Sequence, residues 1–100
     1  MPKLYEYFGI ILLFYANEHE PIHVHGKCQG RESKAELIFV DGELSEIRYG
    51  PVAGKAPLSG REMGYFREIV QARTQDIVRK WIDFFVFHKA IVAERIDRRL

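Results

Sequence analysis

Apolar and polar residues follow two different patterns in the two halves of the chain. In the first half they form short runs of strand length separated by charged and glycine-containing segments, which is typical of antiparallel strands joined by tight turns. The first run is apolar throughout, as expected of a central strand covered on both faces. We therefore predict about four strands, at residues 8–15, 22–28, 33–40 and 43–49, with turns at residues 29–32 and 41–42.

The second half has a helical period. Ser59 and Glu62 have the spacing of a capping box, which predicts a helix that begins at about Ser59. Beyond it, apolar residues recur at spacings of three, four and seven nearly to the C-terminus. One unbroken helix over residues 59–97 would be about 58 Å long, whereas a domain of this size is roughly 30–35 Å across. We therefore expect either a break near residues 73–75, with Thr74 as a new N-cap, or a distal half that packs on another subunit. We favour the break.

These elements define an α+β fold, in which a small antiparallel sheet packs against a long or broken C-terminal helix. The 100 residues predict one domain over residues 1–100, and 47% hydrophobic residues are enough for a core. A net charge of +1 argues against strong overall attraction to nucleic acid, and the single Cys28 excludes an internal disulfide. No apolar run is long enough to span a membrane, and the first residues lack the apolar core of a signal peptide. We expect a soluble, cytoplasmic protein.

Three of the four histidines, His19, His23 and His25, lie within seven residues. Residues 19–23 match the H-E-x-x-H signature of zinc proteases, which requires both histidines on one face of a helix. Pro21 would interrupt that helix and pushes the preceding residue toward extended geometry, so the protease interpretation is excluded.

On a strand, by contrast, alternation places His23 and His25 on one face, with Cα atoms roughly 7 Å apart. The pair can then hold zinc or another divalent metal, with Glu18 and His19 as further ligands from the preceding turn. Acid–base or phosphate chemistry is a further interpretation. The interpretation that the residue types favour first is that these are half-exposed strand residues bonded to neighbouring backbone or carboxylate groups. We expect His88 to be a packed helix residue rather than a fourth ligand.

Residues 81–92 are apolar on almost every side of the predicted helix, more than one sheet face can cover. Exposed aromatic surface of this extent is rare on monomers. We therefore expect a symmetric homodimer through this aromatic helix segment.

The sequence resembles a family of small prokaryotic proteins classed as a domain of unknown function. The family's pattern is an apolar strand, then E/D-H-x-P-P-H-x-H, then a strand and a short G-E turn, with a Trp-Ile pair on the last helix. Here the pattern corresponds to residues 10–15, 18–25 and 41–43 and to Trp81-Ile82, with Ile22 in place of the second proline. The resemblance implies an accessory or toxin–antitoxin-like gene, often encoded beside another small protein, and functional positions at His19, Pro21, His23 and His25.

Three functional hypotheses follow. The first is a toxin–antitoxin-like component that acts through a cognate small protein partner or RNA. The second is a histidine-based metal-binding module. The third is a metal-independent ribonuclease-like enzyme, with His19, His23 and His25 as catalytic groups and an arginine such as Arg31 or Arg48 stabilising negative charge. The sequence leaves open whether the protein is an enzyme.

Overall fold

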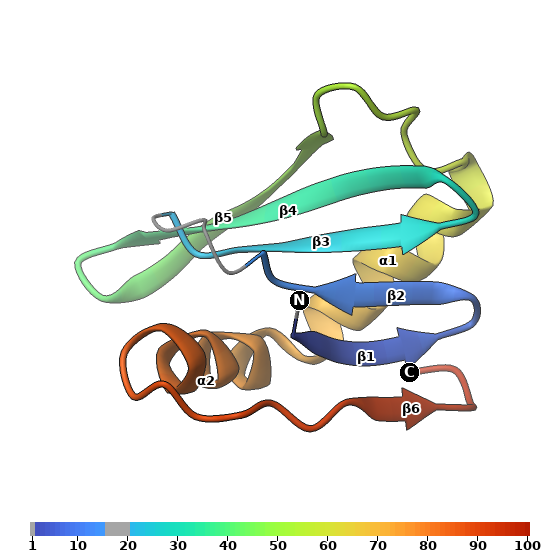
Figure 1. The fold of residues 1–100 in the computed structure, drawn as a ribbon. Helices are drawn as coiled ribbons and strands as arrows, with labels where there is room; N and C mark the ends of the chain where they lie inside the picture. Colours follow the sequence, from blue (N-terminus) through green and yellow to red (C-terminus); the bar gives the residue numbers. More distant parts are fainter. Residues whose placement is uncertain (1, 16–20) are drawn as a thin grey trace.

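A computed structural model describes residues 2–15 and 21–100 of the chain. The described part is a mixed α+β fold in which one six-stranded sheet carries two helices (Figure 1). The elements in chain order are β1 (Lys3–Tyr7), β2 (Ile10–Leu13), β3 (His23–Cys28), β4 (Arg31–Val40), β5 (Glu43–Pro51), α1 (Gly60–Ala72), α2 (Thr74–Phe85) and β6 (Glu94–Ile96).

The sheet has the strand order β5-β4-β3-β2-β1-β6. The first five strands form an antiparallel meander, and β6 returns to pair in parallel with β1. The α+β class is confirmed, but the prediction of about four strands is wrong because β1 and β6 were missed. The predicted central strand at residues 8–15 in fact begins with the turn between β1 and β2. Phe8 and Gly9 have φ of +48° and +84° there, as a two-residue hairpin turn of type I′ requires.

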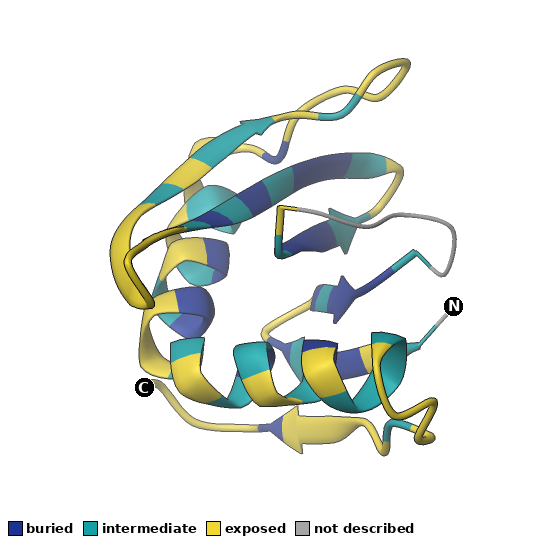
Figure 2. Ribbon diagram, turned by 90° about the vertical axis from the view of Figure 1, so that its left-hand side faces the viewer, coloured by how far each residue is buried: buried dark blue, intermediate teal, exposed yellow. Residues whose placement is uncertain are grey.

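Helix α1 lies on one face of the sheet, and α2 lies across the end at which β2 ends and β3 begins (Figure 1 and Figure 2). Gly26 of β3 faces α1 so closely that an added Cβ would lie 2.7 Å from a ring carbon of Phe66. On β1, the hydroxyl of Tyr5 donates to Asp76 of α2, and that of Tyr7 donates to Glu68 of α1. Buried residues concentrate between sheet and helices (Figure 2). The fully buried apolar side chains include Leu4, Tyr5, Tyr7, Ile10, Leu12, Phe14, Val24, Phe66, Ile69 and Ile77.

The start of the first helix confirms the capping box. The Ser59 hydroxyl accepts from the Glu62 backbone N–H at 3.3 Å, and the Ser59 N–H donates to Glu62 Oε1 at 2.8 Å. The break is also confirmed, since α1 ends at Ala72 and α2 begins at Thr74. The prediction that Thr74 is the N-cap of the second helix is wrong, because the N-cap is Arg73. The Thr74 hydroxyl instead donates to the Val70 carbonyl at 2.8 Å and so satisfies a backbone acceptor at the C-terminal end of α1.

The expected helix does not continue nearly to Leu100, because α2 ends at Phe85. The segment after it contains a residue with a positive φ, His88 at +55°, and then forms β6 along the free edge of β1. The molecule measures 32 × 28 × 26 Å along its principal axes, so one helix over residues 59–97 would have projected far beyond it. Within the described residues, neither helix has the length and apolar character needed to cross a membrane.

Candidate functional site

The two histidines of β3 lie side by side, as the strand alternation predicted. The ring centroids of His23 and His25 are 5.3 Å apart. Gly26, which alternates with them, faces Phe66 of α1. The histidine pair therefore points away from α1, at the end of the sheet where β3 begins, and His23 there lies near Trp81 of α2.

Both imidazoles are largely shielded from solvent. His23 is 8% exposed and His25 is 3% exposed. The expectation of half-exposed strand residues is therefore wrong, although the expected bonding to a carboxylate and to backbone is present. Burial of both rings matters chemically, because a small ion can reach a buried nitrogen far more easily than a phosphodiester backbone can.

His25 is held by a carboxylate and a tyrosine. Its Nδ1 lies 2.8 Å from Oε2 of Glu32 on β4, and the hydroxyl of Tyr15 donates to the same oxygen at 2.9 Å. The Tyr15 ring packs edge-on against His25, with centroids 4.5 Å apart. Glu32 is 1% exposed, so this network is buried. Hydrogen bonds among buried polar groups are stronger than in water and fix side-chain orientation.

His23 is held by the backbone. Its Nδ1 lies 2.7 Å from the carbonyl oxygen of Pro21, and its ring centroid is 5.4 Å from that of Trp81 on α2. A carbonyl oxygen can only accept, so Nδ1 of His23 carries the proton. An ionised Glu32 also only accepts, which assigns the same tautomer to His25. In the neutral rings the lone pair then lies on Nε2 of both histidines.

Glu32 also has an oxygen whose hydrogen-bonding capacity is not used within the described part of the chain. Its Oε1 is buried there without a hydrogen-bond partner. A buried carboxylate oxygen in this state costs free energy that a cation or a hydrogen-bond donor would offset. The orphaned oxygen therefore marks a position beside His25 that is chemically suited to a positively charged or proton-donating group.

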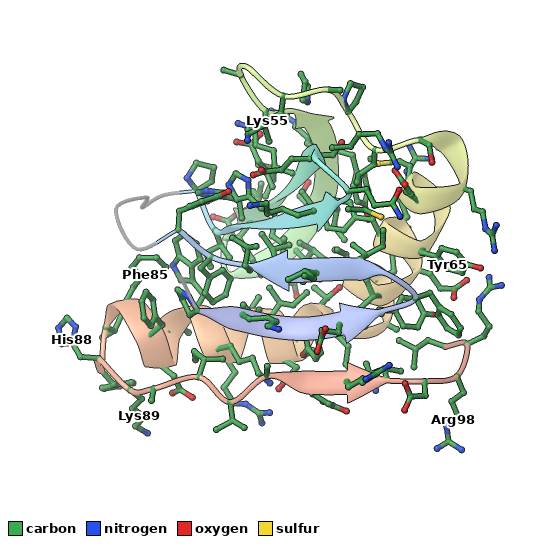
Figure 3. All side chains as sticks on the ribbon, turned by 45° about the vertical axis from the view of Figure 1, so that its right-hand side comes forward. Lys55, Tyr65, Phe85, His88, Lys89 and Arg98 are labelled. Atoms are coloured by element: carbon green, nitrogen blue, oxygen red, sulfur yellow. The ribbon has the colours of Figure 1, made fainter. Side chains whose placement is uncertain are left out.

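Two of the predicted metal ligands, Glu18 and His19, lie outside the described residues. Among the residues that the structure does describe, no group of three or more ligand-type side chains gathers at one point. His88 lies beyond the end of α2, is exposed, and points away from the sheet (Figure 3). The prediction that it is a packed helix residue is therefore wrong, and it does not contribute to the histidine site.

Neither arginine considered for charge stabilisation belongs to the site. Nε of Arg31 donates to Glu62 of α1 at 2.8 Å, so this guanidinium is engaged on the helix side of the sheet. It holds the pKa of the Glu62 carboxyl well below its usual range. Arg48 lies on β5, two strands away from β3, and donates to Glu46 at 3.0 Å.

Glu32 and Tyr15 are the members of the site that the sequence analysis missed. Glu32 was assigned to the turn after β3, whereas β4 already begins at Arg31. In the hairpin register Glu32 pairs with Lys27, one position along the same face from His25. A hairpin built around a two-residue turn at Gln29-Gly30 would have identified it, because that turn fixes which residues face one another.

A shallow groove lies beside the site on the same face of the sheet. Leu13, the cross-strand neighbour of His25, lines it together with Ile11. Lys3 and Lys27 also line the groove, which has a volume of about 360 Å³. The groove next to the histidines therefore has an apolar floor formed by Ile11 and Leu13, and it carries the ammonium groups of Lys3 and Lys27.

Comparisons with known proteins give one family and no individual relative. The model of the family DUF4160, described as a domain of unknown function, matches residues 9–82. That range includes β2, β3, β4, β5 and α1 and most of α2, together with all the histidine-site residues described above. No curated protein and no solved structure matches the chain. The match spans well over half of the sequence, and the chain therefore belongs to the DUF4160 family of domains of unknown function.

Proposed function

We propose that this protein binds a divalent metal ion of borderline softness, such as zinc, through Nε2 of His23 and Nε2 of His25. The observation that carries the proposal is that Nδ1 of each ring lies against an acceptor, Pro21 O or Glu32 Oε2. Metal-binding histidines almost always donate their second ring N–H to a carboxylate or a backbone carbonyl, which fixes the tautomer and ring orientation.

Glu32 and Tyr15 act as the outer layer of this site. Glu32 orients His25, and Tyr15 orients Glu32 by donating to the same oxygen. The buried Oε1 of Glu32, which has no hydrogen-bond partner among the described residues, would be satisfied by a cation or a donor nearby. We propose Glu18 and His19, which lie outside the described residues, as further ligands, because zinc is commonly four-coordinate and accepts both imidazole nitrogen and carboxylate oxygen.

The burial of the two rings favours a small ion over direct chemistry on RNA. A general acid or base must come within hydrogen-bond reach of the proton it transfers, and a histidine that is 3% exposed offers little surface to a polynucleotide. Metal-independent ribonuclease activity is therefore the less favoured function for these histidines. The samples prepared for the metal-binding experiment can also be assayed for it.

Metal content decides the proposal. Purified, untagged protein is loaded with one equivalent of Zn²⁺, desalted and measured by elemental analysis, beside the variants His25→Ala, Glu32→Gln and His88→Ala. We expect one metal per chain in the wild type and in His88→Ala, the control for removing an exposed imidazole. His25→Ala should lose the metal, and Glu32→Gln should bind about 10–100-fold more weakly. Equal metal content in wild type and His25→Ala would refute the site.

The same samples test RNA cleavage. Wild type and His23→Ala are incubated with a mixed RNA substrate in the presence of a chelator. If the wild type cleaves RNA without metal and His23→Ala does not, the histidines serve acid–base chemistry and the metal proposal fails.

We also propose that the protein acts as one member of a toxin–antitoxin-like pair through a cognate small protein. The family resemblance favours this role, as does exposed apolar surface after α2, where Val86 and Phe87 are each 60% exposed. Host growth should differ between cells that express this chain alone and cells that express it together with the product of the neighbouring gene. That product should also co-purify with the chain. Unchanged growth together with no co-purifying protein would count against this role, whatever the metal result.

A further inference from the structure

The strand β5 presents a long free edge. It spans the nine residues Glu43–Pro51 and pairs only with β4, because it is the outermost strand of the described sheet (Figure 1). The opposite edge is β6, which has only three residues. A long edge exposes a row of backbone donors and acceptors that can pair with another chain. Of the two edges, β5 therefore has the greater capacity for strand addition.

The hairpin of β4 and β5 also carries apolar surface that the helices leave uncovered. Leu37 pairs with Ile47 in the register and belongs to the core. The next same-face pair, Phe39 with Leu44, is 38% and 39% exposed. A bulge in the register after Ile38 keeps these two side chains opposite each other. An apolar stripe thus runs from the core onto the exposed end of the hairpin, where a second layer of protein would cover it.

The sequence of β5 is complementary to itself in one antiparallel alignment. With a two-fold axis at Ile47, Glu46 lies opposite Arg48 of the partner subunit, and the same pair forms again across the axis. Opposite charges in directly facing positions stabilise a strand pair, whereas like charges destabilise it. Moving the axis by one residue sets Glu46 against its own copy or Arg48 against its own copy. Charge therefore selects the axis at Ile47.

We propose that β5 pairs with β5 of a second copy about this axis, so that the two six-stranded sheets become one continuous sheet. In the isolated chain, Glu46 and Arg48 already lie on one face, with a guanidinium-to-carboxylate distance of 3.0 Å. Both are largely exposed, at 50% and 61% of the side chain. Pairing lets each of them contact an opposite charge on the partner without moving the strand. The inference concerns assembly and does not depend on metal binding.

Charge reversal tests this alignment. The mass in solution is measured by sedimentation for the wild type, Glu46→Arg, Arg48→Glu and an equimolar mixture of the two variants. The wild type should be a dimer. Each variant alone sets like charges against each other twice, which should raise the dimer Kd about tenfold or more. In the mixture, arginines on one strand face glutamates on the other, so the dimer should return.

The recovery in the mixture separates pairing between subunits from any effect within one strand, because neither chain changes on mixing. Arg98→Glu makes the same charge change on an exposed side chain near the C-terminus (Figure 3) and should remain dimeric. Circular dichroism checks that each variant is folded.

A monomeric wild type at its highest soluble concentration would overturn the proposal, as would two variants that stay dimeric. A dimer that is lost in Phe87→Ser but kept in Glu46→Arg and Arg48→Glu would also overturn it. That last result would assign the interface to the aromatic segment that follows α2.

Discussion

Gly26 and Phe66 are in direct contact across the interface between β3 and α1, at a distance that leaves no room for a methyl group. A Cβ on Gly26 would lie 2.7 and 2.8 Å from two ring carbons of Phe66, which is itself fully buried. Strand β3 carries the histidine pair on one side and packs against α1 on the other. Position 26 faces α1, and the helix lies too close there for any side chain. Close packing of Gly26 on Phe66 thus holds the histidine strand against α1.

Replacement of Gly26 by alanine should therefore destabilise the fold. A ring in a packed core cannot move without forcing other side chains off their rotamers, which typically costs about 1–3 kcal/mol. Gly64→Ala is the matched control, because Gly64 is helical and nothing lies within 4 Å of its added Cβ. That change should raise stability by about 0.5–1 kcal/mol. Urea denaturation followed by circular dichroism measures both, and a neutral Gly26→Ala would contradict the tight contact.

The turn that carries Gln29 should be open to improvement. Gln29 has φ of +50° and is followed by Gly30 at +82°. Asparagine tolerates this left-handed conformation better than glutamine, and Asn-Gly is the preferred pair for such a turn. Gln29→Asn should stabilise the protein by about 0.5 kcal/mol. Gln71→Asn, in the exposed part of α1, should instead lower stability, because asparagine is the poorer helix former. The two midpoints in urea should move in opposite directions.

Three hairpin turns of the same kind show where the sequence was informative. The turn at Asp41-Gly42 was predicted, and the turn at Gln29-Gly30 was located but drawn two residues too long, at residues 29–32. Each has glycine next to a polar residue between two strand-like runs. The turn at Phe8-Gly9 also has two positive φ angles, but it begins with an aromatic residue inside an apolar run. The Phe8 ring stacks on Tyr65 of α1, with centroids 5.2 Å apart. Tertiary packing therefore fixes a turn that local sequence does not signal, and β1 was missed with it.

The end of the helix and half of the site escaped prediction for the same reason. The helical period continues past Phe85, yet the chain leaves the helix and pairs with the free edge of β1, which no local pattern reveals. That His23 and His25 lie on the same face of β3 followed from strand alternation alone. The position of Glu32 beside His25 depends on the register between β3 and β4, and the position of Tyr15 depends on the path of the chain after β2. Local pattern thus located the histidines but not the groups that orient them.

The hydroxyl of Tyr15 should contribute to stability through Glu32. Its hydrogen bond of 2.9 Å ends on a carboxylate that is 1% exposed. Hydrogen bonds to charged groups contribute about 1.5–3 kcal/mol, so Tyr15→Phe should lower the free energy of unfolding by an amount in this range. Tyr65→Phe on α1 is the control for removing a phenol oxygen. If the two variants lose equal stability, Tyr15 does not support the Glu32–His25 network.

The contact between Tyr5 and Asp76 should make stability depend on pH. Burial raises the pKa of the Asp76 carboxyl, but hydrogen bonds from Lys80 at 2.5 Å and from Tyr5 outweigh it and lower the pKa from 3.8 to about 2. Burial and the bond to Asp76 raise the pKa of Tyr5. Because the folded pKa of Asp76 lies below the unfolded one, its contribution is complete above pH 4 and is lost as the pH falls toward 2.

Asp76→Asn should therefore be less stable than the wild type at neutral pH, by about 1 kcal/mol after allowance for solvent screening. The deficit should shrink between pH 4 and 2, where the wild type loses the contribution that the variant lacks. Asp83→Asn is the control on the same helix, since its ion pair with Lys89 is long, at 3.9 Å, and the Lys89 side chain is 65% exposed. Urea midpoints measured at several pH values give both curves. A deficit for Asp76→Asn that is constant from pH 7 to pH 2 would mean that the carboxylate charge does not couple β1 to α2.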